Sequence, residues 1–593
     1  MSIVEHVSSL RCLMLERGVD GYLILGTDPH LSEYVPDAWK TREWISGFTG
    51  SYGKVAITRD LAVLWTDSRY FIQAEAQLAG SGIAMLKDRQ ADTISADDWF
   101  IQNLPSGSVV AIDGLTVSAS EANVLEQKLG AKGLTFIQDM DMLSPIWEGR
   151  PKFPNSPIVD YPVKYAGLGR QEKLVQIRKK LVEAGAEATL ITPADDLAWC
   201  FNLRGNDIRY NPLFTGYGYI DQQKAVLIID PSKLDTGLKE ELEREGIYVI
   251  NYDSIFSYLD LINPVIFHLD PAQTNSSIYT HISKRCQVIS GPSISTLLKS
   301  VKNDIEIEGM KQAHIRDGVA MVNFLYWFEQ QFGREKITEI SVAEKLKEFR
   351  AEQDLYMGES FSPIIGFGPH GAIVHYSATP ESDAEVLKDS ILLFDSGGQY
   401  LDGTTDITRT IPTGIPTAQQ RSDFTLVLKG MIQLANIVFP ENTKGYSLDT
   451  IARKALWDNG LNYGHGTGHG VGHYSSVHEG PMAIRQEYNG EPIRVGQVLS
   501  NEPAFYRAGQ YGIRTENVIV CKNYCQTEFG RFLTFETLTL CPVDKRLVNP
   551  DILTDSELTW LNTYHDKVYS VLNFRLKPEV QNWLSDQCSP ISK

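Results

Sequence analysis

The sequence has few cysteines, no long apolar run and no basic cluster. None of the 7 cysteines forms a Cys-x-x-Cys pair, which disfavours a disulfide framework or thiolate zinc site and suits the reducing cytoplasm. No apolar stretch reaches the roughly 18 residues of a membrane span, and the N-terminus lacks a secretory signal. Lys and Arg number 55 against 74 Asp and Glu, and the net charge is -19. We therefore expect neither membrane nor nucleic acid as a partner.

An internal repeat is present in the first half of the 593-residue chain. A helix-like segment that ends at glycine and leads into an apolar run occurs at residues 15–25 and again at 182–191. In both copies an Asp-containing turn and an aromatic segment follow. These patterns predict two copies of one α/β module. Three prolines and a glycine within residues 149–158 indicate the linker between the copies.

The pattern changes near residue 302. Apolar positions from 310 to 328 keep a helical period, and Ser341–Glu344 and Thr417–Gln420 each fit a capping box. β-rich segments accompany these helices, at residues 364–376, 391–411, 498–506 and 513–520. We predict two α/β domains followed by an α+β domain, with bounds 1–155, 156–302 and 303–593.

Two glycine-rich motifs in the last domain resemble known sites but do not fit them. Gly366–Gly371 matches G-x-G-x-x-G, yet it contains Pro369 and precedes a strand-like segment, whereas a dinucleotide site needs a helix there. His465 and His469 have the spacing of a zincin pair, but the Glu is missing and glycines disfavour a helix. A glycine-rich loop can still direct an imidazole at a metal.

Two aspartates lie on strand-like runs of the same domain. A hairpin turning at Asp402-Gly403 would set Asp406 opposite Gln399. Asp395 is four residues from Gln399, about 13 Å along a regular strand. A bend at Gly397-Gly398 would be needed to bring the two carboxylates together, so spacing alone leaves a shared site open.

Two glutamates lie in apolar segments where an isolated carboxylate is costly. Taken singly, Glu502 could be a turn residue before Pro503, and Glu516 could pair with Arg514 across a strand. Together with the two aspartates and one histidine they form an oxygen-rich set of four negative charges. Two divalent cations would balance that charge.

Six motifs, in order, resemble aminopeptidase P of the creatinase/prolidase superfamily. They are D-S-G-x-Q-Y, D-G-T-T-D-I-T-R-T, H-G-T-G-H-G-V-G, V-H-E-G-P, N-E-P and G-I-R-x-E-N. Upstream, residues 45–50, 65–71 and 201–206 resemble the long, three-domain cytosolic form, whose first two domains are copies of each other. The resemblance implies two creatinase-type α/β domains followed by a pita-bread α+β catalytic domain.

The resemblance also implies a set of metal ligands. Matched by motif, Asp395 would bind the first metal, Asp406 and Glu516 would bridge, and His469 and Glu502 would hold the second. The family usually uses manganese, so two Mn²⁺ ions per chain are expected, with Zn²⁺ or Co²⁺ as alternatives. Asn501 and Ala504 replace the family's usual Asp and Gly, which bears on the level of activity rather than on the reaction.

Further residues match substrate positions of the family. His375, His465 and His478 would contact substrate or the tetrahedral intermediate, and Arg514 would orient the site around the residue after the cut. These roles imply hydrolysis of the N-terminal Xaa-Pro bond by a hydroxide that bridges the metals, with Glu502 accepting the water's proton. The imide nitrogen of proline has no hydrogen, so a pocket for its ring would provide selectivity.

Three alternatives to this function remain. A prolidase-like dipeptidase has the same five ligands, and a non-catalytic binding module keeps the fold without them. A creatinase-like hydrolase works without metals, which the intact ligand set disfavours. The long form favours the aminopeptidase, with Arg69 and Arg204 ordering the cleft without closing it. The resemblance also implies a homodimer through the residues after about 303, and Trp560 and Tyr564, which look exposed in the sequence, agree with it.

Overall fold

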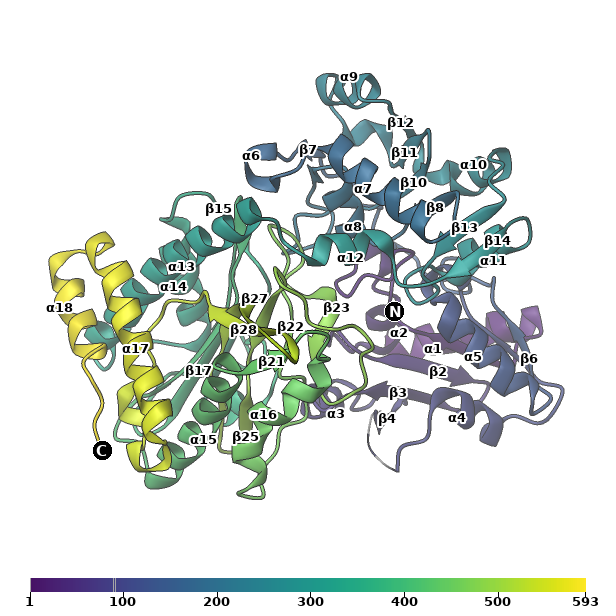
Figure 1. The fold of residues 1–593 in the computed structure, drawn as a ribbon. Helices are drawn as coiled ribbons and strands as arrows, with labels where there is room; N and C mark the ends of the chain where they lie inside the picture. The colour runs from purple at the N-terminus through teal and green to yellow at the C-terminus, as the bar shows by residue number, and fades with distance from the viewer. Residues whose placement is uncertain (1, 89, 91) are drawn as a thin grey trace. The chain divides into compact units, whose positions relative to one another are not determined.

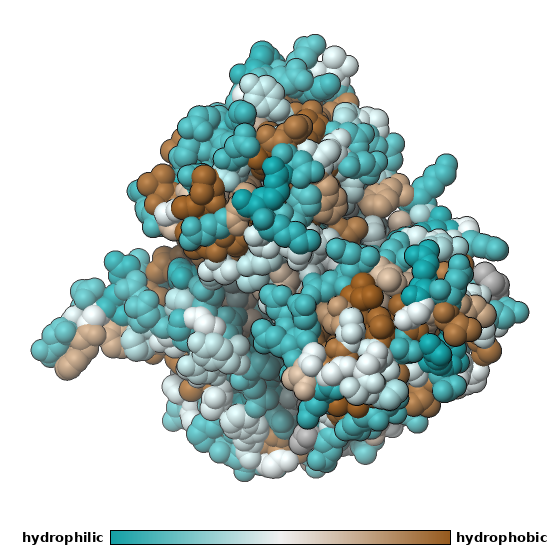
Figure 2. Space-filling model, turned by 90° about the vertical axis from the view of Figure 1, so that its right-hand side faces the viewer, coloured by the Kyte–Doolittle hydropathy of each residue, from teal (hydrophilic) through white to brown (hydrophobic). Residues whose placement is uncertain are grey.

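The computed structural model describes residues 2–88, 90 and 92–593, and the chain forms two compact units (Figure 1). Unit 1 comprises residues 1–162 and 168–297, and unit 2 comprises residues 163–167 and 298–593. All seven cysteines are unpaired. Among the described residues no helix combines the length and apolarity that a membrane crossing needs. Most of the face drawn in Figure 2 is hydrophilic, with hydrophobic residues in separate patches.

Unit 1 contains two six-stranded sheets of the same topology. Their strand orders are β4-β3-β2-β1-β5-β6 and β12-β11-β10-β8-β13-β14. Each sheet has a strand, β1 (Gly21–Ile24) or β8 (Ala188–Ile191), that is antiparallel to one neighbour and parallel to the other. The helices before them, α1 (Ile3–Arg17) and α7 (Arg170–Glu183), end close to a glycine with positive φ. The predicted repeat is therefore confirmed as a duplicated fold.

The remaining elements of unit 1 flank or extend these sheets. The first sheet adds β2 (Lys54–Thr58), β3 (Ala62–Thr66), β4 (Ala84–Lys87), β5 (Val109–Ala111) and β6 (Thr135–Ile137), with helices α2 (Thr41–Ser46), α3 (Phe71–Gln77), α4 (Ala96–Asn103) and α5 (Ala119–Gly130). The second adds β10 (Tyr217–Asp221), β11 (Ala225–Ile228), β12 (Ile247–Ile250), β13 (Ile266–Leu269) and β14 (Gln287–Ser290), with α8 (Ala194–Cys200), α9 (Thr236–Arg244), α10 (Ile255–Leu261) and α11 (Ser276–Ser283). β7 (Val159–Asp160) pairs with β9 (Leu203–Arg204).

The two modules of unit 1 meet through equivalent residues. Ser118 caps α5, Asn275 caps α11, and these two residues pair in an isolated antiparallel bridge. On either side of the bridge, one backbone N–H of each module donates to a carbonyl of the other, at 2.9 and 2.8 Å. The same positions of both copies therefore face each other, as they do in a twofold dimer.

Unit 2 combines antiparallel sheets with long helices. α15 (Ala418–Ala435) begins at the predicted capping box of Thr417. α14 (Glu339–Ala351) begins earlier than predicted, because Thr338 is its cap and accepts the N–H of Ser341. The other helices are α6 (Val163–Ala166), α13 (Asp304–Gln331), α16 (Gly445–Trp457), α17 (Asp555–Leu572) and α18 (Pro578–Gln587), and α12 (Ile294–Ser300) spans the boundary between the units at residues 297 and 298.

The strands of unit 2 form one six-stranded sheet and three smaller ones. Their orders are β15-β18-β19, β16-β17-β20, β21-β28-β27-β24-β22-β23 and β25-β26. The strands are β15 (Tyr356–Glu359), β16 (Ile364–Phe367), β17 (Ile391–Ser396), β18 (Gly398–Tyr400), β19 (Gly403–Thr404), β20 (Ile407–Pro412), β21 (Val438–Pro440), β22 (Gly468–Gly470), β23 (Glu479–Ile484), β24 (Val498–Asn501), β25 (Ala504–Arg507), β26 (Tyr511–Arg514), β27 (Asn517–Thr527) and β28 (Gly530–Thr537). After β16 the chain forms a 3-10 turn, η5 (Gly368–Ala372), so the strand predicted up to residue 376 is wrong beyond Phe367.

The hairpin that carries the two aspartates has a different register from the predicted one. Tyr400 pairs with Gly403 and Gln399 pairs with Thr404. The turn therefore lies one residue earlier than predicted, and the expected pairing of Asp406 with Gln399 is wrong. A reversal of direction is encoded locally, but its register depends on which backbone groups pair.

The bend near Gly397 is present. Asp395 faces Thr408 in the β17–β20 pair, and β17 ends one residue before Gly397. The chain then enters a different sheet as β18. A Cβ atom at Gly397 would lie 2.0 Å from the Thr405 carbonyl oxygen and 2.2 Å from Ser360 Oγ. Only glycine therefore fits this close approach of two strands.

Helix α17 does not display Tyr564 on the surface. The Tyr564 ring is buried, and its hydroxyl accepts a hydrogen bond from Arg409 Nη2 at 3.0 Å. Trp560 stacks on it with ring centroids 5.4 Å apart. The expectation of an exposed Tyr564 is thus wrong, and it does not support the predicted dimer.

Candidate active site

Five predicted ligand residues converge in unit 2 from segments far apart in the sequence. The pairs β17–β20 and β24–β27 bring the segments together. Asp395 is on β17, Asp406 precedes β20, His469 is on β22, Glu502 follows β24 and Glu516 lies between β26 and β27.

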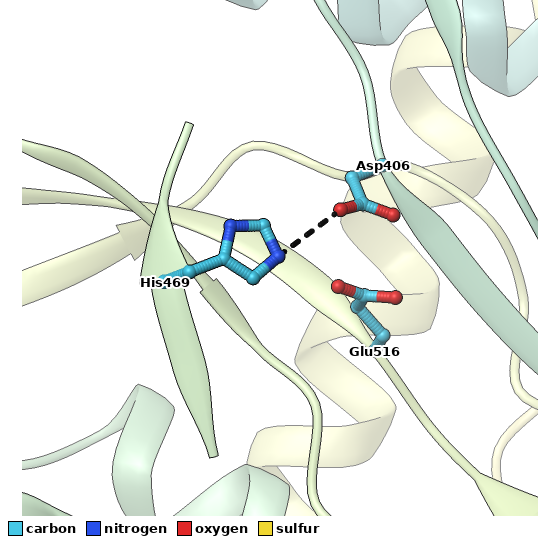
Figure 3. Close-up of side chains that lie close together, drawn as sticks. All are labelled: Asp406, His469 and Glu516. Carbon is cyan, nitrogen blue, oxygen red and sulfur yellow. Dashed lines mark ion pairs between the residues drawn. The ribbon is translucent and has the colours of Figure 1, made fainter. Parts of the chain in front are cut away.

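Asp406, His469 and Glu516 direct their polar atoms toward one another (Figure 3). One ligand atom from each lies within 4.8 Å of the others. His469 Nε2 is 3.4 Å from Asp406 Oδ2 and 3.5 Å from Glu502 Oε1. His469 Nδ1 donates to the Gly470 carbonyl at 2.9 Å, which directs Nε2 toward the acids. This is the arrangement of a metal-binding imidazole.

Asp395 is held by an arginine through one oxygen only. Arg514 donates to Asp395 Oδ2 from Nε at 3.1 Å and from Nη2 at 2.5 Å. The other oxygen, Oδ1, is buried without a hydrogen-bond partner among the described residues. A buried carboxylate oxygen without a partner is costly. A cation at this position would supply the missing partner. Arg514 thus pairs with Asp395, and not with Glu516 as one reading of the sequence allowed.

The acids lie in an environment that opposes their ionisation. Burial, partly offset by His469 and Arg514, raises the pKa of Glu502 to about 7. Burial likewise raises the pKa of Asp395 to about 6, with Arg514 acting in the opposite direction. Burial and then the negative charges of Asp406, Asp395 and Glu502 place the pKa of Glu516 well above its ordinary value. The cluster has an excess of negative charge, so its oxygen-rich donor set fits divalent cations.

A tyrosine that the sequence analysis missed links His465 to this cluster. Arg514 Nη1 donates to Tyr506 Oη at 2.6 Å, and that hydroxyl lies 2.8 Å from His465 Nε2. His465 Nδ1 donates to the Gly466 carbonyl at 2.8 Å, so Nε2 accepts a hydrogen bond from the Tyr506 hydroxyl. A hydrogen-bonded chain therefore runs from His465 through Tyr506 and Arg514 to Asp395. Tyr506 reaches this chain only because β25 pairs with β26.

The two other predicted histidines take different positions. The His478 ring packs nearly perpendicular to His469, with centroids 4.3 Å apart. His375 is half-buried in the turn after η5. η5 packs closely on β26, since a Cβ at Gly512 would lie 1.7 Å from the Gly371 carbonyl oxygen. His375 therefore comes shortly after η5, and η5 contacts β26, the strand that ends at Arg514.

Family profiles match almost the whole chain. Residues 308–523 match metallopeptidase family M24, residues 531–591 match its C-terminal region, and residues 6–143 and 149–306 each match the creatinase/prolidase N-terminal domain. The chain is 38% identical to the probable Xaa-Pro aminopeptidase P of Laccaria bicolor, covering 100% of this chain and 94% of that protein. It is also 38% identical to aminopeptidase P2 of Arabidopsis thaliana, covering 99% and 89%.

The chain belongs to the aminopeptidase P family of M24 metallopeptidases.

Solved structures agree with membership of the aminopeptidase P family. The X-prolyl aminopeptidase of Caenorhabditis elegans, described as a cytosolic enzyme with a di-nuclear active site, matches with a TM-score of 0.96 and 35% identity over 100% of both chains. The Xaa-Pro dipeptidase of Bacillus anthracis matches 63% of this chain and 99% of its own, with a TM-score of 0.51 and 22% identity. The second likeness shows a shared fold only. The predicted family and fold class are confirmed.

Contacts of two further residues in this aminopeptidase P family member, Thr408 and Arg350, lay outside the sequence prediction. Thr408 donates to Glu516 Oε2 at 2.8 Å, and it lies opposite Asp395 in the sheet. Beneath the bend, Arg350 donates to the Ser396 carbonyl at 3.3 Å and pairs with Asp317 at 2.8 Å. Arg350 is only 1% exposed, yet a helical arginine in a sequence usually indicates a solvated face. Only the packing of α13 and α14 identifies it as buried.

Proposed function

We propose that this chain is a metal-dependent aminopeptidase that hydrolyses the N-terminal Xaa-Pro bond of peptides. The observation that carries the proposal is the buried cluster of carboxylates around His469, with the unpartnered Oδ1 of Asp395. Full-length relatives are named Xaa-Pro aminopeptidases, and they support the aminopeptidase over the prolidase-like alternative. A non-catalytic module would not need to retain such a costly set of acids.

We propose that two divalent cations, manganese in preference, occupy the cluster. Asp395, Asp406, His469, Glu502 and Glu516 would hold them, and the di-nuclear site of the Caenorhabditis elegans enzyme supports this number. When bound, the cations would lower the pKa of a shared water toward neutrality and polarise the scissile carbonyl.

The protein's own residues would position the peptide and move protons. Glu502, with its pKa near neutrality and its carboxylate beside His469, is suited to accept the proton of the attacking water. His375, His465 and His478 would contact the substrate. Arg514, held by Asp395 and Tyr506, would orient the site around the proline residue.

Several finer features belong to the same proposal. We propose domain boundaries at 155/156 and 302/303, a cytoplasmic location and a homodimer formed through the residues after about 303. The family profiles end at residues 143 and 306 and begin again at 149 and 308, which supports a boundary near each proposed position. The description of the Caenorhabditis elegans neighbour as cytosolic supports the location. Sedimentation at micromolar concentration tests the dimer, and a species of only 66.4 kDa would overturn it.

A comparison of three peptides at saturating manganese tests the substrate class. Xaa-Pro-Yaa should be cleaved to release Xaa, and Xaa-Ala-Yaa should be slower by about 10³-fold in kcat/KM, because alanine loses the ring contacts and adds an unpaired N–H. Faster cleavage of the dipeptide Xaa-Pro would assign a prolidase instead. Comparable cleavage of the alanine peptide would remove proline specificity from the proposal.

The metal requirement has its own test. Chelation should abolish hydrolysis, elemental analysis should find up to two divalent ions per chain, and manganese should restore activity better than magnesium because one ligand is an imidazole. Full activity of the metal-free protein would contradict the dinuclear site.

A further inference from the structure

Glu339, at the start of α14, is a completely buried carboxylate outside the metal cluster. Its Oε1 accepts the backbone N–H of Phe367 at 2.8 Å, and its Oε2 accepts the backbone N–H of Ala384 at 3.0 Å. His370 Nδ1 donates to it at 2.9 Å, and the Tyr376 hydroxyl donates at 3.0 Å. The Glu339 side chain therefore accepts hydrogen bonds from four residues of one segment, residues 367–384.

These four donors define the 367–384 loop. The loop begins at the last residue of β16 and ends just before Glu385, which forms an isolated antiparallel bridge with Thr338. Within the loop, the rings of His370 and Tyr376 stack with centroids 4.4 Å apart. His375 immediately precedes Tyr376. Fixing the two ring-bearing residues on either side of residue 375 restricts the positions that the His375 imidazole can take.

The 367–384 loop lies against the strands of the candidate active site. It leaves β16, in which Ile364 pairs with Asp395. Its η5 segment contacts β26 through the close approach of Gly371 and Gly512. The carboxylate of Glu339 thus anchors a loop whose other face rests on the strands of Asp395 and Arg514.

We infer that Glu339 is a positioning residue that holds the 367–384 loop, and with it His375, in place for hydrolysis. The inference rests on the proposed function for its kinetic consequence only. Glu339 itself does not touch the reacting atoms. Since each of its two oxygens accepts a backbone N–H from a different end of the loop, a glutamine cannot replace it in either orientation.

The test begins with Glu339→Gln in the full-length, manganese-loaded enzyme. We expect kcat/KM for Xaa-Pro-Yaa to fall by about 10²-fold, because a misplacement of about 1 Å can cost that much. The fall should be carried mostly by kcat, and the metal content should equal that of the wild type, because the ligands themselves are unchanged.

Glu557 provides a matched control. It also lies in the first turn of a unit 2 helix, is 6% exposed, and accepts hydrogen bonds from Thr554 N, Lys429 and Gln433. None of these partners belongs to the 367–384 loop. Glu557→Gln should lower the thermal midpoint while leaving kcat/KM within about twofold of the wild type.

A double-mutant cycle distinguishes positioning from general damage. If Glu339 acts through His375, then Glu339→Gln in a His375→Ala background should cause less than about a twofold further loss. An equal loss in both backgrounds, or no loss in the single variant, would overturn the inference. Should Glu339→Gln not fold, Tyr376→Phe keeps the ring stack, removes one donor and should give a smaller loss that also vanishes in the His375→Ala background.

Hydrogen exchange separates this inference from the proposed function. The amides of Phe367 and Ala384 should exchange at least about tenfold faster in Glu339→Gln than in the wild type, and they should be unchanged in Glu557→Gln. That result would hold even if the wild type did not cleave Xaa-Pro-Yaa, in which case the proposed function alone would fail. Unchanged protection of both amides would refute the anchoring role.

Discussion

The buried ion pair of Lys233 in unit 1 and the acid cluster of unit 2 balance their charged side chains differently. In unit 1, Lys233 and Asp207 form a buried pair at 2.6 Å, and the carboxylate also accepts hydrogen bonds from Thr215 and Ser156. In unit 2, three buried acids and the half-buried Glu502 lie around one arginine and one histidine. A complete pair needs nothing further, whereas the second arrangement lacks positive charge. The difference separates a structural ion pair from a site built for cations.

Removing one acid from each unit should produce opposite results. Asp406→Asn should lower kcat/KM for Xaa-Pro-Yaa by about 10⁴-fold or more while the protein stays folded, because it removes a ligand and relieves repulsion. Asp207→Asn should keep the activity of the molecules that remain folded. Kinetics normalised to folded protein, with circular dichroism, measure both. An active Asp406→Asn enzyme would contradict the distinction between the structural ion pair and the acid cluster.

Breaking the structural pair should act on stability instead. Lys233→Met leaves Asp207 charged and buried, and we expect a loss of about 3–5 kcal/mol in the unfolding free energy of unit 1. Denaturant unfolding of the full chain would measure the loss. The kcat of the folded fraction should not change. A stability like that of the wild type would mean that this pair contributes no more than a surface pair.

The acid cluster should make the metal-free protein less stable as the pH rises. Glu502 has its pKa raised from 4.5 to about 7, so the folded state binds the proton more tightly than the unfolded state. Between these values its contribution to the free energy of unfolding should therefore fall as the pH rises. Glu502→Gln should weaken this dependence of stability on pH. Saturating manganese should reverse its sign, because cations favour the ionised form of their ligands. Thermal unfolding across this range measures the trend, and an unchanged slope in Glu502→Gln would contradict it.

The smallest expected effect concerns the link between the histidine loop and the cluster. Tyr506→Phe removes the hydroxyl between His465 and Arg514 and should lower kcat/KM by roughly tenfold, which is the loss expected for one charge-assisted hydrogen bond. Metal content should not change. A loss as large as that of Asp406→Asn would place Tyr506 among the essential groups, and no loss would show that the chain of hydrogen bonds is dispensable.

Much of the fold was predictable because its signals are local. The glycine that follows α1 and the one that follows α7, together with the apolar strands after them, repeat in the sequence and in the structure. The cap of α15 was also visible, since Thr417 and Gln420 are three residues apart. The hairpin register was not, because the local Asp402-Gly403 signal favours a turn one residue later than the one that the strand pairing adopts.

The sequence by itself determined which residue types were available for chemistry: four acids, a histidine and the glycines that permit a bend at residue 397. Motif order also determined the family. Only the tertiary structure decided that Asp395 retains an unpartnered oxygen, that Tyr506 joins His465 to Arg514, and that Glu339 and Arg350 are buried. The physical reason is that burial and hydrogen-bond partners depend on strands and helices distant in the chain, and these set the cost and the pKa of each charged group.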